Sequence, residues 1–192
     1  MIAYYTTSCK DVQRQISPLN FVLCTLYWLF SLKEHKNCKL ILVRKINLPR
    51  LFASLALPFI AGAIGSYFTF PSIETWYSAL TKPAFSPPNY LFGPVWSVLY
   101  LLMGVSLYFV WKKYLKLFLF HLALSAFWSI SFFGMQNISL GLLVIIALWA
   151  VIAYMIIKFY KVEKLASYLL IPYLVWVTFA AYLNFSLLLL NP

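Results

Sequence analysis

The sequence predicts an all-α polytopic membrane protein, folded as a bundle of five transmembrane helices. Hydrophobic residues make up 64% of the 192-residue chain and charged residues only 10%, whereas a soluble domain has about a quarter charged residues. Five apolar runs have no charged residue in their interiors and are long enough to cross a bilayer core of about 30 Å. Basic residues gather at alternate ends of these runs. This composition excludes a cytosolic enzyme, a disordered chain and a free-standing nucleic-acid binder.

Residues 1–46 are expected to form an N-terminal extension ahead of a membrane domain at residues 47–192. Residues 17–32 are an uncharged stretch that is short for a membrane span. This stretch is compatible with an interfacial or buried segment and with a sixth helix, and both interpretations stay open. A cleaved signal peptide fits poorly, because no small-x-small cleavage site precedes the Lys-rich residues that follow. The three cysteines, Cys9, Cys24 and Cys38, give no pairing pattern.

The membrane domain is predicted to cross the bilayer five times, since a span needs about 20 apolar residues. The last run is the longest, so we expect its helix to tilt or to extend beyond the bilayer. The first loop, residues 71–90, holds several prolines, which exclude a continuous helix there and favour a semi-rigid loop. The expected helices span about residues 51–70, 91–111, 117–134, 140–159 and 165–190.

The charges of the loops predict the orientation of the bundle. The first loop carries one acid and one base, Glu74 and Lys82, and the third loop, near residues 135–139, carries no charge. The residues before the first run and the second and fourth loops are basic, so we expect this N-terminal basic side to face the cytoplasm. A plasma or inner membrane is the expected location. The basic residues of this side are Lys33, Lys36, Lys39, Arg44, Lys45, Arg50, Lys112, Lys113, Lys116, Lys158, Lys161 and Lys164.

The chain shows no catalytic constellation of a familiar kind. It lacks a Ser–His–Asp set, paired carboxylates and a phosphate-binding loop, and its two histidines, His35 and His121, lie far apart without flanking carboxylates. We therefore expect no metal site and no required cofactor. Ion-driven transporters usually keep an intramembrane carboxylate, which the apolar runs lack.

Aromatic residues make up 20% of the chain, and some lie too deep for an interfacial belt. Trp128 and Trp176 fall near the middle of their runs, where an indole N–H needs an acceptor from protein or ligand. One face of the fifth run carries Tyr173, Trp176, Ala180 and Asn184. That face suits the wall of a pocket for a flat ligand. The alternative is that its polar side chains only join helices by hydrogen bonds, and the spacing alone slightly favours this alternative.

The second and third runs offer faces of the same kind. Trp96 and Tyr100 are i, i+4 neighbours just after the first loop, and the third run places Ser125, Trp128 and Phe132 on a shared face. Pockets between helices, with apolar walls and few polar groups, are the common form of a small-molecule site. We therefore predict an aromatic cavity that the first loop could cover.

Three stretches resemble one known family. Residues 76–111 read WYSALTKPAFSPPNYLFGPVWSVLYLLMGVSLYFVW, residues 128–134 read WSISFFG, and residues 169–185 read LLIPYLVWVTFAAYLNF. In this order they resemble the TspO/MBR family of tryptophan-rich sensory proteins, translocator proteins and peripheral-type benzodiazepine receptors, over about residues 48–192. The resemblance implies a five-helix bundle, usually a homodimer, with a cavity capped by the first loop. It also implies binding of tetrapyrroles such as protoporphyrin IX and haem, and of isoquinoline or benzodiazepine drugs.

Carried over motif by motif, the resemblance assigns ligand-binding roles to the first loop and to the second, third and fifth runs. Some bacterial members are reported to degrade porphyrin photo-oxidatively through two cavity tryptophans, and the matching positions here are Trp96 and Trp176. The ligand-binding positions are Trp76, Tyr77, Pro83, Pro87, Pro88, Trp96, Tyr100, Ser125, Trp128, Phe132, Trp176, Ala180 and Asn184.

The chain departs from the family pattern at three places. The third-helix motif of the family usually reads LN-x-x-WSP, whereas this chain has Ser125 in place of the amide and Ile130 in place of the proline. An acidic residue that is common early in the fourth helix is Val144 here. The end of the fifth run lacks the basic residue of the proposed cholesterol motif, so cholesterol binding is unsupported. The changes in the third run predict a ligand affinity different from that of relatives.

The leading hypothesis for function is a membrane receptor or sensor that binds tetrapyrroles and regulates porphyrin levels. A second hypothesis is a light- and oxygen-dependent enzyme that degrades porphyrin. A transporter of porphyrin or another lipophile is a third, and an aromatic-rich scaffold that only assembles with a partner is the plainest. The expected partners are a tetrapyrrole or other lipophilic small molecule, membrane lipid and a second copy of the chain, but no nucleic acid.

Overall fold

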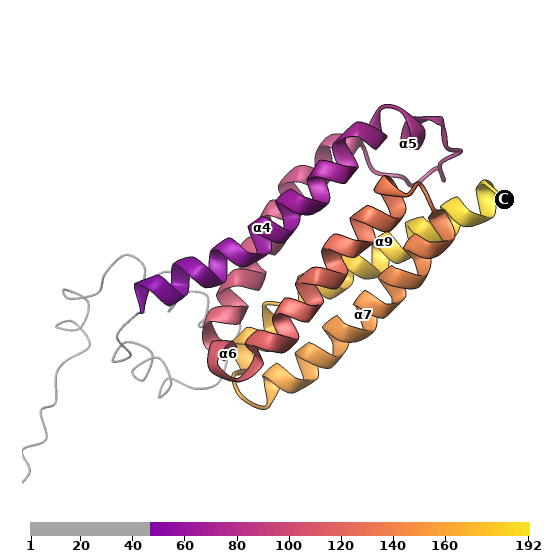
Figure 1. Cartoon of the computed structure of the whole chain (residues 1–192). Coiled ribbons are helices and arrows are strands. Elements are labelled where there is room, and N and C mark those ends of the chain that lie inside the picture. The colour runs from indigo at the N-terminus through magenta and orange to yellow at the C-terminus, as the bar shows by residue number, and fades with distance from the viewer. Residues whose placement is uncertain (1–46) are drawn as a thin grey trace, which may run out of the picture. The chain divides into compact units, whose positions relative to one another are not determined.

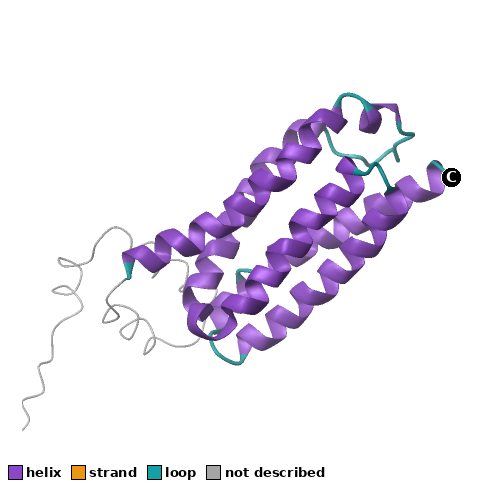
Figure 2. Ribbon diagram, viewed as in Figure 1, coloured by secondary structure: helices purple, strands orange, loops and turns teal. Residues whose placement is uncertain are grey.

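Helices account for nearly all of residues 47–192, the part of the chain that the computed structural model describes (Figures 1 and 2). Residues 1–46, with the expected extension and its stretch 17–32, lie outside the described residues. The described part contains no strand, and Leu48–Pro192 form one compact unit. The predicted all-α class is therefore confirmed.

The first transmembrane helix is longer than its predicted span. Helix α4 (Leu48–Ile73) has 26 residues and reaches about 39 Å at 1.5 Å per residue, enough to cross a bilayer core. It continues through Pro71 and ends at Ile73. The first loop follows and contains the short helix α5 (Trp76–Ala79) and the 3₁₀ turn η1 (Asn89–Leu91).

Two of the predicted spans belong to one unbroken helix, α6 (Phe92–Ser129). If it were straight, its 38 residues would extend about 57 Å. However, Tyr100 near its start and Ser129 at its end both approach the middle of α4, at Gly62 and Gly65 respectively. The helix must therefore double back on itself, and Figure 1 shows the reversal near the α6 label.

The reversal of α6 lies at the second predicted loop. Tyr108 still stacks with Arg50 at the start of α4, 5.2 Å from guanidinium carbon to ring centroid. The three lysines Lys112, Lys113 and Lys116 that follow are exposed. By length and composition, four helical segments in residues 47–192 can span a membrane, and one of them, Asn89–Gly134, has 46 residues. This segment holds two of the five predicted spans.

The remaining helices complete the bundle. The five-residue π-helix η2 (Ile130–Gly134) continues α6 and is followed by α7 (Ile138–Tyr160). Helix α7 begins at a true N-cap, because the side chain of Asn137 accepts a hydrogen bond from the backbone N–H of Leu140 at 2.8 Å. The short helix α8 (Lys164–Tyr168) leads into α9 (Ile171–Leu190), whose first turn carries Pro172, a position that proline tolerates.

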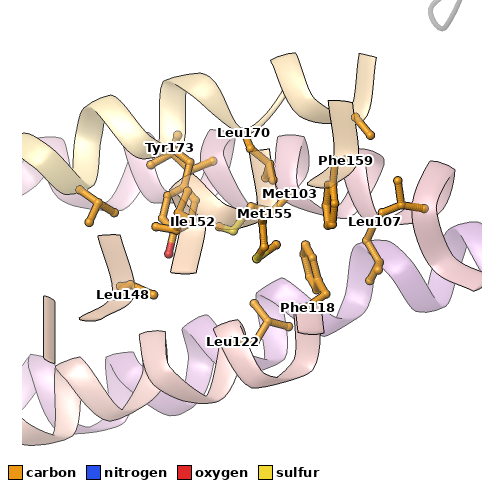
Figure 3. Packing of buried hydrophobic residues seen from close by; sticks show 14 of the residues in the cluster. Met103, Leu107, Phe118, Leu122, Leu148, Ile152, Met155, Phe159, Leu170 and Tyr173 are labelled. Atoms are coloured by element: carbon orange, nitrogen blue, oxygen red, sulfur yellow. The ribbon is translucent and has the colours of Figure 1, made fainter. Parts of the chain in front are cut away.

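We call the two parts of α6 before and after its reversal the first and second limbs. The buried core lies between these limbs and helices α7 and α9 (Figure 3). It is built from large apolar side chains that are almost completely buried, such as Phe118, Ile152, Met155 and Phe159. Packing and hydrogen bonds, rather than burial from water, hold helices together inside a bilayer. Two such hydrogen bonds involve α8: the hydroxyl of Ser106 donates to the carbonyl of Ala166 at 2.7 Å, and the hydroxyl of Ser167 donates to the carbonyl of Ile156 at 2.8 Å.

The outer surface of the bundle carries many large apolar side chains. Phe52 is 70% exposed, Leu143 66% and Val175 63%, on three different helices. An exposed apolar surface of this extent fits a lipid environment and not water. Both the apolar exterior and the helix lengths thus agree with the prediction of a polytopic membrane protein.

Candidate ligand cavity

A cavity of about 480 Å³ lies between α4, the two limbs of α6, η2 and α9. Its size falls within the range of small-molecule sites, roughly 300–1,000 Å³. Eight of the thirteen residues predicted to bind ligand line this cavity: Tyr77, Trp96, Tyr100, Ser125, Trp128, Phe132, Ala180 and Asn184.

Helix α4 contributes one wall that the prediction did not include. This wall holds small and hydroxyl-bearing residues, so that the neighbouring helix limbs come close. A β-carbon built at Gly62 would clash with the ring of Tyr100, and one at Gly65 would lie 2.9 Å from the hydroxyl of Ser129. The only sign of this wall in the sequence was the spacing of small residues in α4. In a membrane helix such spacing indicates close packing of helices more directly than contact with a ligand. The α4 lining consists of Phe59, Ala61, Gly62, Ala63, Gly65, Ser66, Thr69, Phe70 and Ile73.

Aromatic rings form the walls that α6 contributes. In the first limb the rings of Trp96 and Tyr100 lie 5.4 Å apart, and Phe59 of α4 meets Tyr100 edge-on at 5.6 Å. In the second limb Trp128 stacks on Phe132 at 5.6 Å with an interplanar angle of 17°. Aromatic pairs at such distances stabilise one another beyond the area they bury. The rings are therefore held in place before any ligand binds.

The π-helix η2 sets the position of Phe132 and Phe133. Its hydrogen bond runs from the N–H of Met135 to the carbonyl of Ile130, at 2.7 Å and five residues apart. It begins at Ile130, where the family motif usually has a proline, so the helix departs from α geometry there without one. The hydroxyl of Ser72 then donates to the carbonyl of Phe133 at 2.8 Å. Short π-helices of this kind are often found at functional sites.

Helix α9 supplies Ala180, Leu183, Asn184 and Leu187 to the lining. With its amide nitrogen turned toward α7, Asn184 donates to the carbonyl of Ile138 at 3.0 Å and accepts from the N–H of Leu142 at 3.3 Å. This residue therefore joins two helices while it lines the cavity.

Tyr173, on the same face of α9, is fully buried outside the lining. Its hydroxyl lies 3.1 Å from Nε2 of His121. This contact joins α9 to the second limb of α6, as the helix-joining interpretation of that face expects.

The two deep tryptophans of the prediction have different surroundings. Trp128 lines the cavity with its ring, whereas Trp176 is not part of the lining and packs edge-on against Phe92 at 5.9 Å. Both indole N–H groups are covered by protein atoms, and neither has an acceptor among the described residues. Trp128 thus lines the cavity, but its indole N–H is not exposed to it.

In the first loop, only Tyr77 of the five predicted residues reaches the cavity. Trp76 packs edge-on against Phe132 at 5.4 Å, behind the lining. Two of the prolines shape the loop: the N–H of Ser86 donates to the carbonyl of Pro83 at 3.0 Å, and the N–H of Leu91 to that of Pro88 at 3.1 Å. Pro83, Pro87 and Pro88 themselves lie outside the lining.

The polar character of the cavity comes from neutral groups. Burial raises the pKa of Tyr77 above its usual value, and a hydrogen bond with Ser86 only partly opposes this, so the phenol is neutral at physiological pH. No Lys, Arg, Asp, Glu or His of the described residues is among the lining residues. Within residues 47–192, no group of three His, Cys, Asp or Glu side chains could hold a metal ion. The cavity therefore suits an apolar, flat ligand with a few hydrogen-bonding groups.

Comparison with known proteins agrees with this architecture. The sequence pattern of the TspO/MBR family matches residues 54–190, which include most of α4 and all of α6, α7 and α9. The chain belongs to the TspO/MBR family. The predicted family and the integral membrane character that follows from it are therefore confirmed.

Curated TspO/MBR proteins from distant organisms are similar to this chain. The tryptophan-rich protein TspO of Archaeoglobus fulgidus is 44% identical over 153 residues, which cover 76% of this chain and 99% of that protein. The translocator protein of Homo sapiens is 35% identical over 132 residues, 64% of this chain and 78% of that protein. The tryptophan-rich sensory protein of Cereibacter sphaeroides is 32% identical over 123 residues, 62% of this chain and 78% of that protein.

Proposed function

We propose that this TspO/MBR protein is a membrane receptor or sensor that binds a tetrapyrrole, such as protoporphyrin IX or haem, or a similar flat lipophilic ligand. The observation that carries the proposal is the cavity of about 480 Å³ inside the bundle, with its walls of Trp, Tyr and Phe rings. The names of relatives as sensory and translocator proteins are in keeping with such a role. We also propose that the protein forms a homodimer in a plasma or inner membrane. Its basic end then faces the cytoplasm.

The walls of the cavity match the chemistry of a flat macrocycle. Trp96, Tyr100, Trp128 and Phe132 contribute aromatic rings to the walls, and offset or edge-on contacts between rings are favourable. The remaining lining combines further aromatic rings with small and aliphatic residues and with polar groups, among them the hydroxyl groups of Ser66, Thr69 and Ser125. An apolar cavity with a few polar groups binds a large ligand tightly and still orients it.

The test is a titration of the purified protein with protoporphyrin IX in detergent and in the dark, followed by porphyrin absorbance. Ala180→Phe places a ring in the cavity, because Ala180 lines it and is only 8% exposed. We expect saturable binding by the wild type and an affinity at least tenfold lower for the variant, or about 1.4 kcal/mol.

The matched control for this titration is Ala150→Phe, which adds the same ring to an exposed position of α7. Its affinity for porphyrin should equal that of the wild type. Thermal unfolding of each variant shows whether it is folded. Equal, weak and non-saturable uptake by all three proteins would mean partitioning into detergent and would contradict the proposal.

A second candidate, photo-oxidative degradation of porphyrin, is favoured by the position of Trp96. Its indole lies on the cavity wall, where a photoexcited macrocycle could oxidise it in the presence of oxygen. We expect Trp96→Phe to retain most of the dark affinity and to lose light-dependent loss of porphyrin absorbance. Trp176→Phe, outside the lining, should affect the reaction less. Unchanged product formation in Trp96→Phe would exclude this tryptophan from the mechanism.

A further inference from the structure

Lys82 is the one basic side chain at the end of the bundle that carries the first loop, within the described residues. No other Lys, Arg or His occurs between Arg50 and Lys112. The other segments at this end, residues 135–137 and 191–192, are uncharged in their side chains. The clustered lysines of the reversal of α6 and of the α7–α8 connection lie at the opposite end (Figure 1).

The backbone beside Lys82 is anchored to the end of α9. The side-chain oxygen of Asn191 accepts from the N–H of Thr81 at 2.9 Å, and its nitrogen donates to the carbonyl of Thr81 at 3.1 Å and to that of Leu187 at 2.9 Å. On the other side, Pro83 restricts the backbone of Lys82 to extended conformations. The loop therefore presents Lys82 from a fixed place.

The ammonium group of Lys82 lies against a residue of the cavity wall. Its Nζ is 4.7 Å from the ring centroid of Tyr77, and Tyr77 lines the cavity. Lys82 is half-buried, and no salt bridge joins it to Glu74, to Glu163 or to the carboxylate of Pro192 among the described residues. A half-buried cation thus lies next to an apolar cavity without a carboxylate partner.

We propose that Lys82 recognises an anionic group, most simply a carboxylate, on the edge of the ligand that faces the first loop. The cavity then selects amphipathic flat molecules, with an apolar body between the rings of α6 and an acidic edge beside Tyr77. A charge-assisted hydrogen bond of this kind is stronger than a neutral one, and low-dielectric surroundings strengthen it further. This inference rests on the proposed function, because it requires a flat ligand in the cavity.

A purely structural role for Lys82 makes a different prediction. A cation over an aromatic ring is attracted to the ring and so stabilises the loop. Loss of that contact would loosen the loop and weaken every ligand to the same degree. Recognition of an acid weakens only ligands that carry one.

The experiment compares two probes that share one macrocycle, protoporphyrin IX with two carboxylates and its dimethyl ester with none. Dissociation constants are measured in the dark for the wild type, Lys82→Gln and Lys82→Arg. The matched control is Lys113→Gln, which removes a lysine that also stacks on a tyrosine, 5.5 Å from the ring of Tyr114, but at the opposite end of the bundle. Comparing the ratio of the two affinities between variants cancels differences in how the probes partition into detergent.

We expect Lys82→Gln to weaken the diacid by about five- to tenfold, the size of a charged hydrogen bond at a partly exposed site, and to leave the ester unchanged. Lys82→Arg should keep the diacid preference and Lys113→Gln should match the wild type. The diacid preference of the wild type should also shrink as salt is raised.

Equal weakening of both probes by Lys82→Gln, or no effect on either, would overturn the recognition role while leaving the proposed function intact. If the wild type binds the ester saturably and the diacid no better, recognition of an acid is also wrong. Failure of the wild type to bind either probe saturably would instead overturn the proposed function, and this inference with it.

Discussion

The glycines of α6 differ in how closely other helices approach them. A β-carbon at Gly104 in α6 would lie 2.8 Å from Cα of Leu55 and 2.9 Å from the carbonyl oxygen of Ser54, both in α4. Backbone atoms cannot move aside as a flexible side chain can. Gly93, in the first turn of α6, has nothing within 4 Å of the same position. The tight approach of α4 to α6 therefore depends on Gly104 and not on Gly93.

Alanine substitutions at these two glycines should have opposite effects. Both changes remove the flexibility of glycine from a helix, which favours folding by roughly 0.5–1 kcal/mol. At Gly104→Ala the clash with α4 should exceed this gain and destabilise the protein by about 1–3 kcal/mol. Thermal unfolding in detergent, followed by circular dichroism, measures the difference. A melting temperature for Gly104→Ala equal to that of Gly93→Ala would show that the two helices can separate at little cost.

At the scale of the elements, α6 differs most from what the apolar runs suggest. The lysines between the second and third runs predicted a loop, yet helical hydrogen bonds continue through this region from Phe92 to Ser129. Lysine is a good helix former, and the segment contains no glycine or proline to end the helix. The chain nevertheless turns back where the prediction placed the second loop, because exposed lysines must stay outside the bilayer.

The end of the same segment shows a second difference between pattern and structure. The family pattern has a proline at the position of Ile130, and a helix without it would be expected to run on undisturbed. Instead, the π-helix Ile130–Gly134 begins there. It brings Phe132 toward the cavity and leaves the carbonyl of Phe133 to accept from Ser72. Local propensity does not predict a π-helix, since tertiary contacts such as the one to Ser72 stabilise it.

At the scale of the whole molecule, the ends of the bundle differ in charge. Lys112, Lys113 and Lys116 in the reversal of α6 lie at one end, while the short connection at residues 135–137 lies at the other and has no charge. The positive-inside rule assigns the lysine-rich end to the cytoplasm. Orientation is a property of the whole chain, because every crossing must agree with it.

The orientation can be measured with single cysteines in a chain whose Cys9, Cys24 and Cys38 have been replaced by serine. Gln136→Cys and Lys113→Cys place a thiol at exposed positions, the first between η2 and α7 and the second in the reversal of α6. These two segments lie at opposite ends of the bundle (Figure 1). In intact cells, a membrane-impermeant maleimide should label Gln136→Cys and should label Lys113→Cys only after lysis. The reverse pattern would show that the basic end faces outward.

Helical spacing in the sequence predicted part of the cavity lining, but not all of it. The spacing of Trp96 with Tyr100 and of Ser125 with Trp128 and Phe132 gave faces that do line one cavity. The same reasoning included Trp176, which packs against Phe92 outside the lining, and omitted the wall of α4. Helical spacing fixes which residues share a face, but the rotation of each helix depends on packing with its neighbours.

The sequence by itself determined that the protein is a polytopic helical membrane protein of the TspO/MBR family, because apolar length, loop charge and local motifs are properties of the chain alone. The tertiary structure decided which rings surround the cavity, that Gly62 and Gly65 let α6 approach the α4 wall closely, and that Asn191 fixes the loop beside Lys82. These features join residues far apart in the chain, since Thr81 and Asn191 are separated by 110 positions. No local pattern specifies such a contact, because it exists only once the helices have packed.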